Sequence, residues 1–227
     1  MIRILAAAIY IVNLGVLMKG HIGVDESGKG DYFGYLVIAG VYADENAGLK
    51  LKSIGVKDSK ALSDFAVKNL AAEIKKLCAY DVVKISPEKY NILHKKFSSL
   101  NKLLAWGHAR VIENMLGKVK TDSAISDKFG DEGLIKNALM EKGKKITLIQ
   151  KINAEADTAV AAASILARDE FLKTLRALGR EVGTVLPKGA THVEDTAKAL
   201  VEKHGKEVLN FVAKLHFKIT KRVLKGK

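Results

Sequence analysis

Cysteine and proline are scarce in this sequence of 227 residues. Cys78 is the single cysteine, which excludes an intrachain disulfide and a zinc site built on cysteine ligands. The two prolines, Pro87 and Pro187, leave no proline-rich linker, and the sequence shows neither an internal repeat nor a low-complexity segment. We expect a reducing, cytoplasmic location and one large folded domain.

Acidic residues are in the minority. The chain has 38 lysines and arginines against 25 aspartates and glutamates, which gives a net charge of +13. Such an excess favours a polyanionic partner, either nucleic acid or an anionic membrane surface, and charge alone does not choose between them. Apolar residues make up 48% and charged residues 28% of the chain, which excludes extended disorder and indicates a globular protein with a substantial core.

The start of the chain, residues 1–17, is apolar apart from Arg3 and Asn13. It resembles a signal-peptide core or a short membrane anchor, but it lacks a clear small-residue cleavage site and is barely long enough to span a bilayer. We favour a third interpretation, in which translation begins at Met18. We therefore expect an apolar extension at 1–17, a folded domain at 18–227 and no membrane association.

Hydrophobic periodicity predicts strands early in the chain, followed by helices that alternate with single strands. Strands are predicted at 22–24, 35–42, 81–85, 124–126 and 145–151, and helices at 61–79, 87–118, 133–141, 156–178 and 193–217. The first two strands form a hairpin in this prediction, Ser63 and Asp64 cap the first helix, and the last helix breaks near Gly205. Trp106 and His108 are expected to be core and helix-edge residues of their helix and not a catalytic pair. The pattern predicts an α/β sheet with helices packed against it.

Five acids fall at the edges of these predicted elements. Asp25 and Glu26 end the first strand, Asp127 follows the strand at 124–126, and Glu155 and Asp157 precede a helix. Carboxylates that converge above a sheet suit hard cations such as Mg²⁺ or Mn²⁺. Taken one at a time, each acid has an ordinary alternative, such as ending a strand or complementing a helix dipole.

Glycine gathers around Lys29 in the stretch G-V-D-E-S-G-K-G-D-Y-F-G at 23–34. Gly28, Gly30 and Gly34 permit a tight hairpin with positive φ. The same glycines would let a sugar–phosphate chain approach the backbone while Lys29 meets a phosphate. Both interpretations stay open on the residues alone, because the stretch is not a Walker loop.

Five blocks together resemble the type 2 ribonucleases H and, within that family, the ribonuclease HIII branch. The blocks are GVDESGKGDYFG at 23–34, GVKDSKALS at 55–63, LNKLLAWGHARVIENML at 100–116, AEADTAVAAASILAR at 154–168, and LPKGATHVEDTAKALVEKHGKEVLNFVAKLHF at 186–217. The first is the most discriminating, because ribonuclease HII usually has D-E-A-G-R-G-P where the HIII branch has D-E-x-G-x-G-D-Y-F-G. Here Tyr35 stands where the branch usually has proline.

The resemblance implies an RNase H-like α/β core, with a central mixed sheet flanked by helices and a helical C-terminal part. It implies an endonuclease that cuts the RNA strand of RNA–DNA hybrids with two divalent ions, Mg²⁺ or Mn²⁺, leaving 5′-phosphate and 3′-hydroxyl ends. Many members of the HIII branch also carry an N-terminal substrate-binding domain, and residues 1–20 are too few to form one.

The resemblance also assigns residues. It implies that Asp25, Glu26, Asp127 and Glu155 are catalytic and hold the metals, with Asp157 in reserve for the fourth place. Gly28, Lys29 and Gly30 would sense 2′-hydroxyls in the minor groove. Lys60 and Lys188 would contact phosphates.

Three alternatives remain on the sequence alone: incision at single embedded ribonucleotides in the manner of ribonuclease HII, a non-catalytic nucleic-acid-binding protein of the same fold, and a membrane-tethered protein. The expected partner is an RNA–DNA hybrid duplex, with no obligate protein partner. We expect a monomer, because the enzyme must wrap one duplex.

Overall fold

A mixed sheet of five strands forms the centre of the protein, in the order β3-β2-β1-β4-β5. The structure, a computed structural model, describes residues 20–57 and 59–225, so the expectations for residues 1–17 and for a start at Met18 lie outside it. The strands are β1 (His21–Ser27), β2 (Leu36–Ala43), β3 (Tyr80–Ile85), β4 (Ser123–Asp127) and β5 (Thr147–Lys151). β1 pairs antiparallel with β2 and parallel with β4, which confirms the expected mixed sheet.

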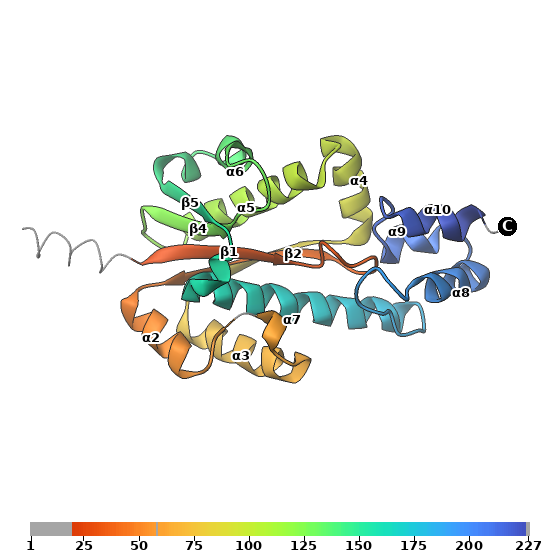
Figure 1. Cartoon of the computed structure of the whole chain (residues 1–227), viewed down its shortest axis with the longest axis horizontal. Coiled ribbons are helices and arrows are strands. Elements are labelled where there is room, and N and C mark those ends of the chain that lie inside the picture. Colours follow the sequence, from red (N-terminus) through yellow and green to blue (C-terminus); the bar gives the residue numbers. More distant parts are fainter. Residues whose placement is uncertain (1–19, 58, 226–227) are drawn as a thin grey trace, which may run out of the picture.

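Helices cover both faces of the sheet, and a further helical group lies at one end of the molecule (Figure 1). One face carries α2 (Glu45–Ser53), α3 (Asp64–Leu77) and α7 (Thr158–Glu181), and the other carries α4 (Pro87–Phe97), α5 (Leu100–Leu116) and α6 (Gly133–Ala138). The end group is α8 (Glu194–His204), α9 (Val208–Val212) and α10 (Lys218–Lys225). The expected α/β architecture with a helical C-terminal part is confirmed. Within the described ranges, no helix is long and apolar enough to cross a membrane.

The sheet separates two hydrophobic cores, and β2 contributes side chains to both. Val37 and Ala39 belong to the cluster on the α7 side, whereas Leu36 and Ile38 belong to the cluster on the α5 side. Successive side chains of a strand point to opposite faces, so a strand covered on both sides needs apolar residues at nearly every position. This is why β2 is an almost continuous apolar run.

The pairing of β1 brings the acidic ends of two strands together. In the predicted hairpin with β2, Asp25 lies opposite Ala39 and Glu26 opposite Ile38. On the other side of β1, Val24 lies beside Ser126 of β4 in a parallel register. Parallel strands end at the same edge of a sheet. The residues that follow this pair, Asp25 in β1 and Asp127 in β4, therefore lie on neighbouring strands near that edge.

Serine side chains decide several helix boundaries. Ser63 accepts a hydrogen bond from the backbone of Ala66 and caps α3 as predicted. The helix predicted over 87–118 is wrong in its continuity, because Ser98 adopts a left-handed conformation and Ser99 caps a new helix, α5. The prediction also missed α2, which Asp44 caps, and it missed α10. The predicted break near Gly205 is confirmed.

Helix α7 lies directly on β1 at Gly23. A β-carbon placed on Gly23 would overlap the backbone of Ala159 and Val160 in the first turn of α7. Backbone cannot rotate away as a side chain can, so the glycine sets how closely the helix approaches the sheet. Small residues in this part of α7, among them Ala161, Ala162 and Ala163, are fully or almost fully buried against the same face.

We expect Gly23→Ala to lower the free energy of unfolding by at least about 3 kcal/mol, because the added methyl group pushes α7 off the sheet. The matched control is Gly48→Ala in α2, where a β-carbon meets nothing within 4 Å. Alanine there should raise the free energy of unfolding by about 0.5–1 kcal/mol through helix propensity. Urea unfolding of both variants measures the difference; equal effects of the two would contradict the close contact.

Candidate functional site

Four of the five acids singled out in the sequence line one small cavity of about 240 Å³. Asp25 and Glu26 reach it from the end of β1, Asp127 from the last position of β4, and Glu155 from the 3-10 turn η3 (Ala154–Ala156). Its full lining is Asp25, Glu26, Ser27, Lys29, Ser59, Lys60, Asp127, Glu155, Ser164 and Arg168. The expected convergence of strand ends and a helix start is therefore what the fold produces.

Asp25 is buried beside another carboxylate, that of Glu26. Burial and the neighbouring charge of Glu26 raise the pKa of Asp25 to about 7, and the charge of Asp127 acts in the same direction. Hydrogen bonds from the backbone of Glu26, at 2.8 Å, and from Ser164 oppose this shift. A carboxylate in this position gains stability from any additional cation nearby.

Glu26 sits in the opposite electrostatic environment although it is equally buried. Burial raises its pKa, but His108 and Lys29 outweigh burial and hold the pKa of Glu26 at about 2. His108 Nε2 lies 2.9 Å from Glu26 Oε2, and Lys29 Nζ lies 2.6 Å from Glu26 Oε1. The other ring nitrogen of His108, Nδ1, lies 3.0 Å from Ser126 Oγ.

His108 is the site residue that sequence reasoning missed. It is a fully buried core residue of α5, as predicted, yet its ring joins α5 to Glu26 at the end of β1. Its position on the apolar side of an amphipathic helix made it look purely structural. The available signal was a polar ring among apolar neighbours, since a buried polar group needs a hydrogen-bond partner.

Lys29 places a positive charge against the acid cluster. Partial burial lowers the pKa of Lys29, but the carboxylates of Glu26, Asp25 and Asp127 outweigh burial and raise it. The lysine predicted to meet a phosphate therefore acts as a counter-ion for the acids in this structure.

The cavity has the donor chemistry of a divalent-cation site, although its side chains have not converged on one point. Among the described residues, no group of three or more His, Cys, Asp or Glu side chains is arranged to hold a metal ion. Glu26 faces His108 and Lys29, and Asp127 Oδ1 accepts a hydrogen bond from Ala154 N at 3.1 Å. Four carboxylates without cysteine or histidine in the lining fit Mg²⁺ or Mn²⁺ in their chemistry.

The wall opposite the acids is held to α7 by a chain of polar contacts. Ser59 Oγ lies 2.6 Å from Ser164 Oγ, and Arg168 donates to the Ser59 carbonyl oxygen. Arg168 Nη2 also donates to Asp64 Oδ1 at 2.7 Å. These contacts fix the segment that carries Lys60, which lines the acid cavity where the sequence placed a phosphate contact.

Asp157, the reserve candidate, lies outside the cavity lining and has a structural task. Its Oδ1 accepts hydrogen bonds from Ala159 N at 3.0 Å and Val160 N at 3.1 Å, and so caps α7. His21 Nε2 lies 2.9 Å from the same carboxylate. Burial raises the pKa of Asp157, but His21 outweighs burial and lowers it. Of the two acids, the structure brings Glu155 to the other three.

The glycine loop after β1 is bonded to the segment that carries Lys188. Gly28 has a φ of 89°, a conformation that glycine adopts without strain. Asp31 Oδ1 accepts a hydrogen bond from Gly189 N at 2.6 Å, and Tyr32 N donates to Gly189 O at 2.8 Å. Lys188 itself points to Asp64, with its Nζ 2.9 Å from Asp64 Oδ2, and does not line the acid cavity.

Lys214 holds the backbone of the D-Y-F-G stretch that follows the loop. Its side chain is fully buried, and its ammonium donates to the carbonyl oxygens of Asp31 at 2.9 Å and Gly34 at 2.7 Å. It also lies 5.7 Å from the centre of the Tyr90 ring, within cation–π distance. Burial lowers the pKa of Lys214 to about 7. A lysine from the C-terminal part thus holds the turn between the glycine loop and β2.

Comparison with known proteins gives consistent matches. The family model described as ribonuclease HII matches residues 22–220. The ribonuclease HIII of Protochlamydia amoebophila is 48% identical over 205 residues, covering 90% of this chain and 68% of that protein. The ribonuclease HIII of Chlamydia pneumoniae is 47% identical over 214 residues, covering 92% of this chain and 72% of that protein.

Solved structures agree. The crystal structure of Bst-RNase HIII in complex with Mn²⁺ superposes with a TM-score of 0.84 at 33% identity, covering 92% of this chain and 70% of that one. Aquifex aeolicus RNase H3 superposes with a TM-score of 0.74 at 34% identity, covering 94% and 78%.

The pH dependence of stability should report the buried Lys214. Its folded pKa is about 7, whereas an unfolded lysine titrates near 10.4, so between these values the unfolded chain binds more protons. Stability should therefore rise with pH over this window, by at most about 1.4 kcal/mol per pH unit. Relative to Lys214→Met, the wild type should gain stability between pH 7 and 9 and show no such gain below pH 6.

Urea unfolding at several pH values measures this difference. Lys221→Met removes an exposed lysine and is the control for the loss of one positive charge. A flat difference for Lys214→Met across pH 7–9 would show that Lys214 stays protonated in its buried position.

Proposed function

We infer that this chain, which belongs to the ribonuclease HII family and within it to the ribonuclease HIII group, cuts the RNA strand of RNA–DNA hybrids as an endonuclease. The observation that carries this function is the acid cavity, because it gathers four carboxylates, two lysines and an arginine at one edge of the sheet. Metal-dependent phosphodiester hydrolysis needs carboxylates that hold the cations and positively charged side chains that bind the phosphates, and the cavity offers both. The products expected are 5′-phosphate and 3′-hydroxyl ends.

The residues proposed to hold two divalent ions, Mg²⁺ or Mn²⁺, are Asp25, Glu26, Asp127 and Glu155. Mn²⁺ in the neighbouring Bst-RNase HIII supports this choice. Paired ions of this kind activate water for attack and stabilise the leaving oxygen. The chain itself orients the ligands: Ser164 contacts Asp25, His108 holds Glu26, and the backbone of Ala154 holds Asp127.

Substrate contacts follow from the walls of the cavity. Lys29 and Lys60 line it and are placed to meet the phosphates of the cut strand. We propose that Lys29 exchanges its contact with Glu26 for a phosphate once cations balance the carboxylates. Gly28 and Gly30 would bring the backbone to the minor groove, where the 2′-hydroxyl distinguishes RNA from DNA. Lys188, held by Asp64 beside this loop, is proposed to bind a phosphate further along.

We propose that residues 18–227 form the catalytic domain and that it acts as a monomer in the cytoplasm without an obligate protein partner. The single cysteine needs no oxidising compartment, and the proposed catalytic carboxylates all come from one chain. The net charge of +13 supports binding to a polyanion such as a hybrid duplex, and this binding should weaken steeply with salt.

Asp25→Asn should reduce cleavage of a labelled RNA–DNA hybrid at least about 10³-fold, because it removes one buried negative charge from the proposed metal site. Hybrid binding and thermal stability should stay close to wild type. The assay compares Mg²⁺, Mn²⁺ and a chelator, with Asp195→Asn on the exposed face of α8 as the charge-matched control. Full cleavage by Asp25→Asn under Mg²⁺ would overturn the assignment of the site.

Glu155→Gln and Asp157→Asn separate the fourth ligand from the helix cap. Glu155→Gln should lose cleavage by a similar factor, since its carboxylate lines the cavity. Asp157→Asn should retain most activity, because asparagine caps helices about as well as aspartate. The same hybrid assay measures both, and the reverse order of effects would move the fourth ligand to Asp157.

A further inference from the structure

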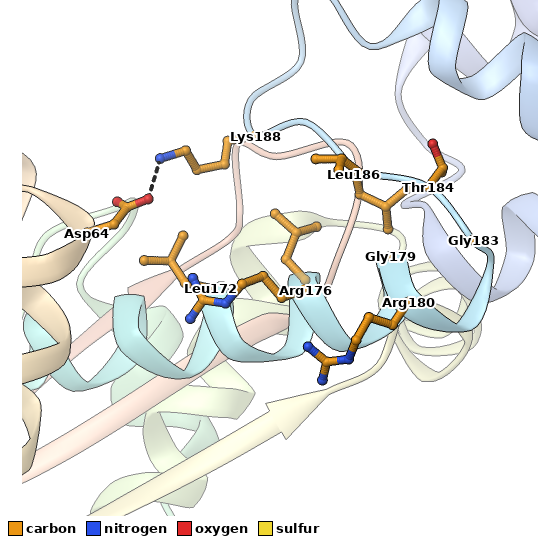
Figure 2. A pocket seen from close by; sticks show the side chains of 11 residues that line it. Asp64, Leu172, Arg176, Gly179, Arg180, Gly183, Thr184, Leu186 and Lys188 are labelled. Atoms are coloured by element: carbon orange, nitrogen blue, oxygen red, sulfur yellow. Dashed lines mark hydrogen bonds and ion pairs between the residues drawn. The ribbon is translucent and has the colours of Figure 1, made fainter.

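A second, larger cavity of about 600 Å³ runs along the C-terminal half of α7 (Figure 2). One wall is α7 itself, the other is the segment 183–188 that follows it, and Asp64 at the start of α3 closes one end. Leu172, Leu175 and Leu186 are buried and give the groove an apolar floor. The acid cavity does not account for this groove, because the two linings share no residue.

The groove is built by a glycine inside a helix. A β-carbon on Gly179 would lie 2.7 Å from the carbonyl oxygen of Thr184, so only glycine lets the segment 183–188 pack this closely. Glycine in a helix interior costs about 1 kcal/mol relative to alanine. The segment therefore forms a wall at a specific distance from α7.

Positive charge surrounds the apolar floor. Three basic residues line the groove: Arg176, Arg180 and Lys188. The acidic residue in the lining is Asp64, whose carboxylate already accepts hydrogen bonds from Lys188 Nζ and Arg168 Nη2. Within the described ranges, neither the Arg176 guanidinium nor the Arg180 guanidinium forms a hydrogen bond or ion pair with another residue. Both arginines are exposed. The groove thus offers two uncompensated guanidinium groups above leucine side chains.

Helix α7 connects this groove to the acid cavity. Its first half carries Ser164 and Arg168, which line the acid cavity, and Phe171 follows beneath the glycine loop, 2.9 Å from a β-carbon placed on Gly28. The groove begins at Leu172 on the same helix. A bound strand that extends from the acid cavity along α7 would therefore pass the glycine loop and enter the groove.

The distance along α7 from the acid cavity to Arg180 sets how far from that cavity Arg180 would contact a bound duplex. Arg180 lies twelve positions after Arg168, which is about 18 Å at the rise of an α-helix. Along the axis of a duplex, the phosphates of one strand advance by about 3.4 Å per nucleotide, so 18 Å corresponds to about five nucleotide steps for a duplex whose axis runs parallel to α7.

We propose that this groove holds the sugar–phosphate backbone of the bound duplex about five nucleotide steps from the cut. Arg176 and Arg180 contact phosphates, and the leucine floor contacts the apolar faces of the sugars. The proposal rests on the proposed function, because it places the groove on the path of the same nucleic acid. An acidic, partly apolar peptide would match the groove chemically, but the continuity with the acid cavity favours nucleic acid.

The test is the double variant Arg176→Gln/Arg180→Gln. Its matched control is Lys50→Gln/Lys52→Gln on α2, which removes two exposed charges at the opposite end of β1 from the acids. The substrates are duplexes in which a short ribonucleotide run fixes the position of the cut. In one series the arm on one side of this run is lengthened from 2 to 12 base pairs, and in a second series the arm on the other side is lengthened in the same way. Steady-state cleavage and equilibrium binding are measured at several salt concentrations, and thermal unfolding checks that both variants fold.

For the wild type, KM should fall as the arm on one side grows past about five base pairs, with kcat unchanged. The arginine variant should lose this gain, with a KM about tenfold higher on long arms and no change on short ones. On duplexes with long arms, the slope of the logarithm of the binding constant against the logarithm of the salt concentration should be smaller in magnitude by about 2 for the arginine variant than for the wild type. On duplexes with short arms the two slopes should be equal. The lysine control should keep the wild-type length dependence.

A wild-type dependence on arm length in the arginine variant would overturn the groove assignment while leaving the proposed activity standing. An equal loss on short and long arms would also overturn it, because it would place the arginines at the cut or make their effect general. A wild-type protein that cleaves no hybrid at all would overturn the proposed activity and the groove assignment with it.

Discussion

The backbone contact between α7 and β1 at Gly23 is the constraint on which the rest of the structure depends. It fixes the height and direction of a 24-residue helix over the sheet. From that starting point, Ser164 arrives beside Asp25, Phe171 supports the glycine loop, and Arg176 borders the second groove. The acid cavity, the glycine loop and the groove thus all lie along one helix, and a shift at the start of α7 displaces all three together.

Electrostatics divides the acid cluster into unlike partners. Glu26 is kept ionised by His108 and Lys29, whereas Asp25, its neighbour in the chain, is pushed toward neutrality by burial and by that same charge. A strongly basic protein therefore contains one buried spot where negative charge is in excess. Cations can be recruited there without weakening the attraction that the rest of the surface exerts on a polyanion.

Local patterns in the sequence predicted the hairpin, the sheet type and most elements, because periodicity and caps act over a few residues. They failed where a single side chain overrides a pattern, as at Ser98, which ends a helix that periodicity would continue. They also failed for contacts between distant segments: the ring of His108 on Glu26 and the ammonium of Lys214 in its carbonyl cage. The choice between Glu155 and Asp157 is of the same kind, since it depends on which acid the cap of α7 uses.

The Lys214 contact has a consequence for the order in which the protein matures. Its ammonium joins the carbonyl of Asp31 across 183 positions of the sequence. Contacts of such separation close a very long loop and form late, and during synthesis the lysine emerges from the ribosome after the whole sheet. A nascent chain can therefore bring its acids together before the glycine loop is anchored, and that loop reaches its final geometry only when synthesis nears its end.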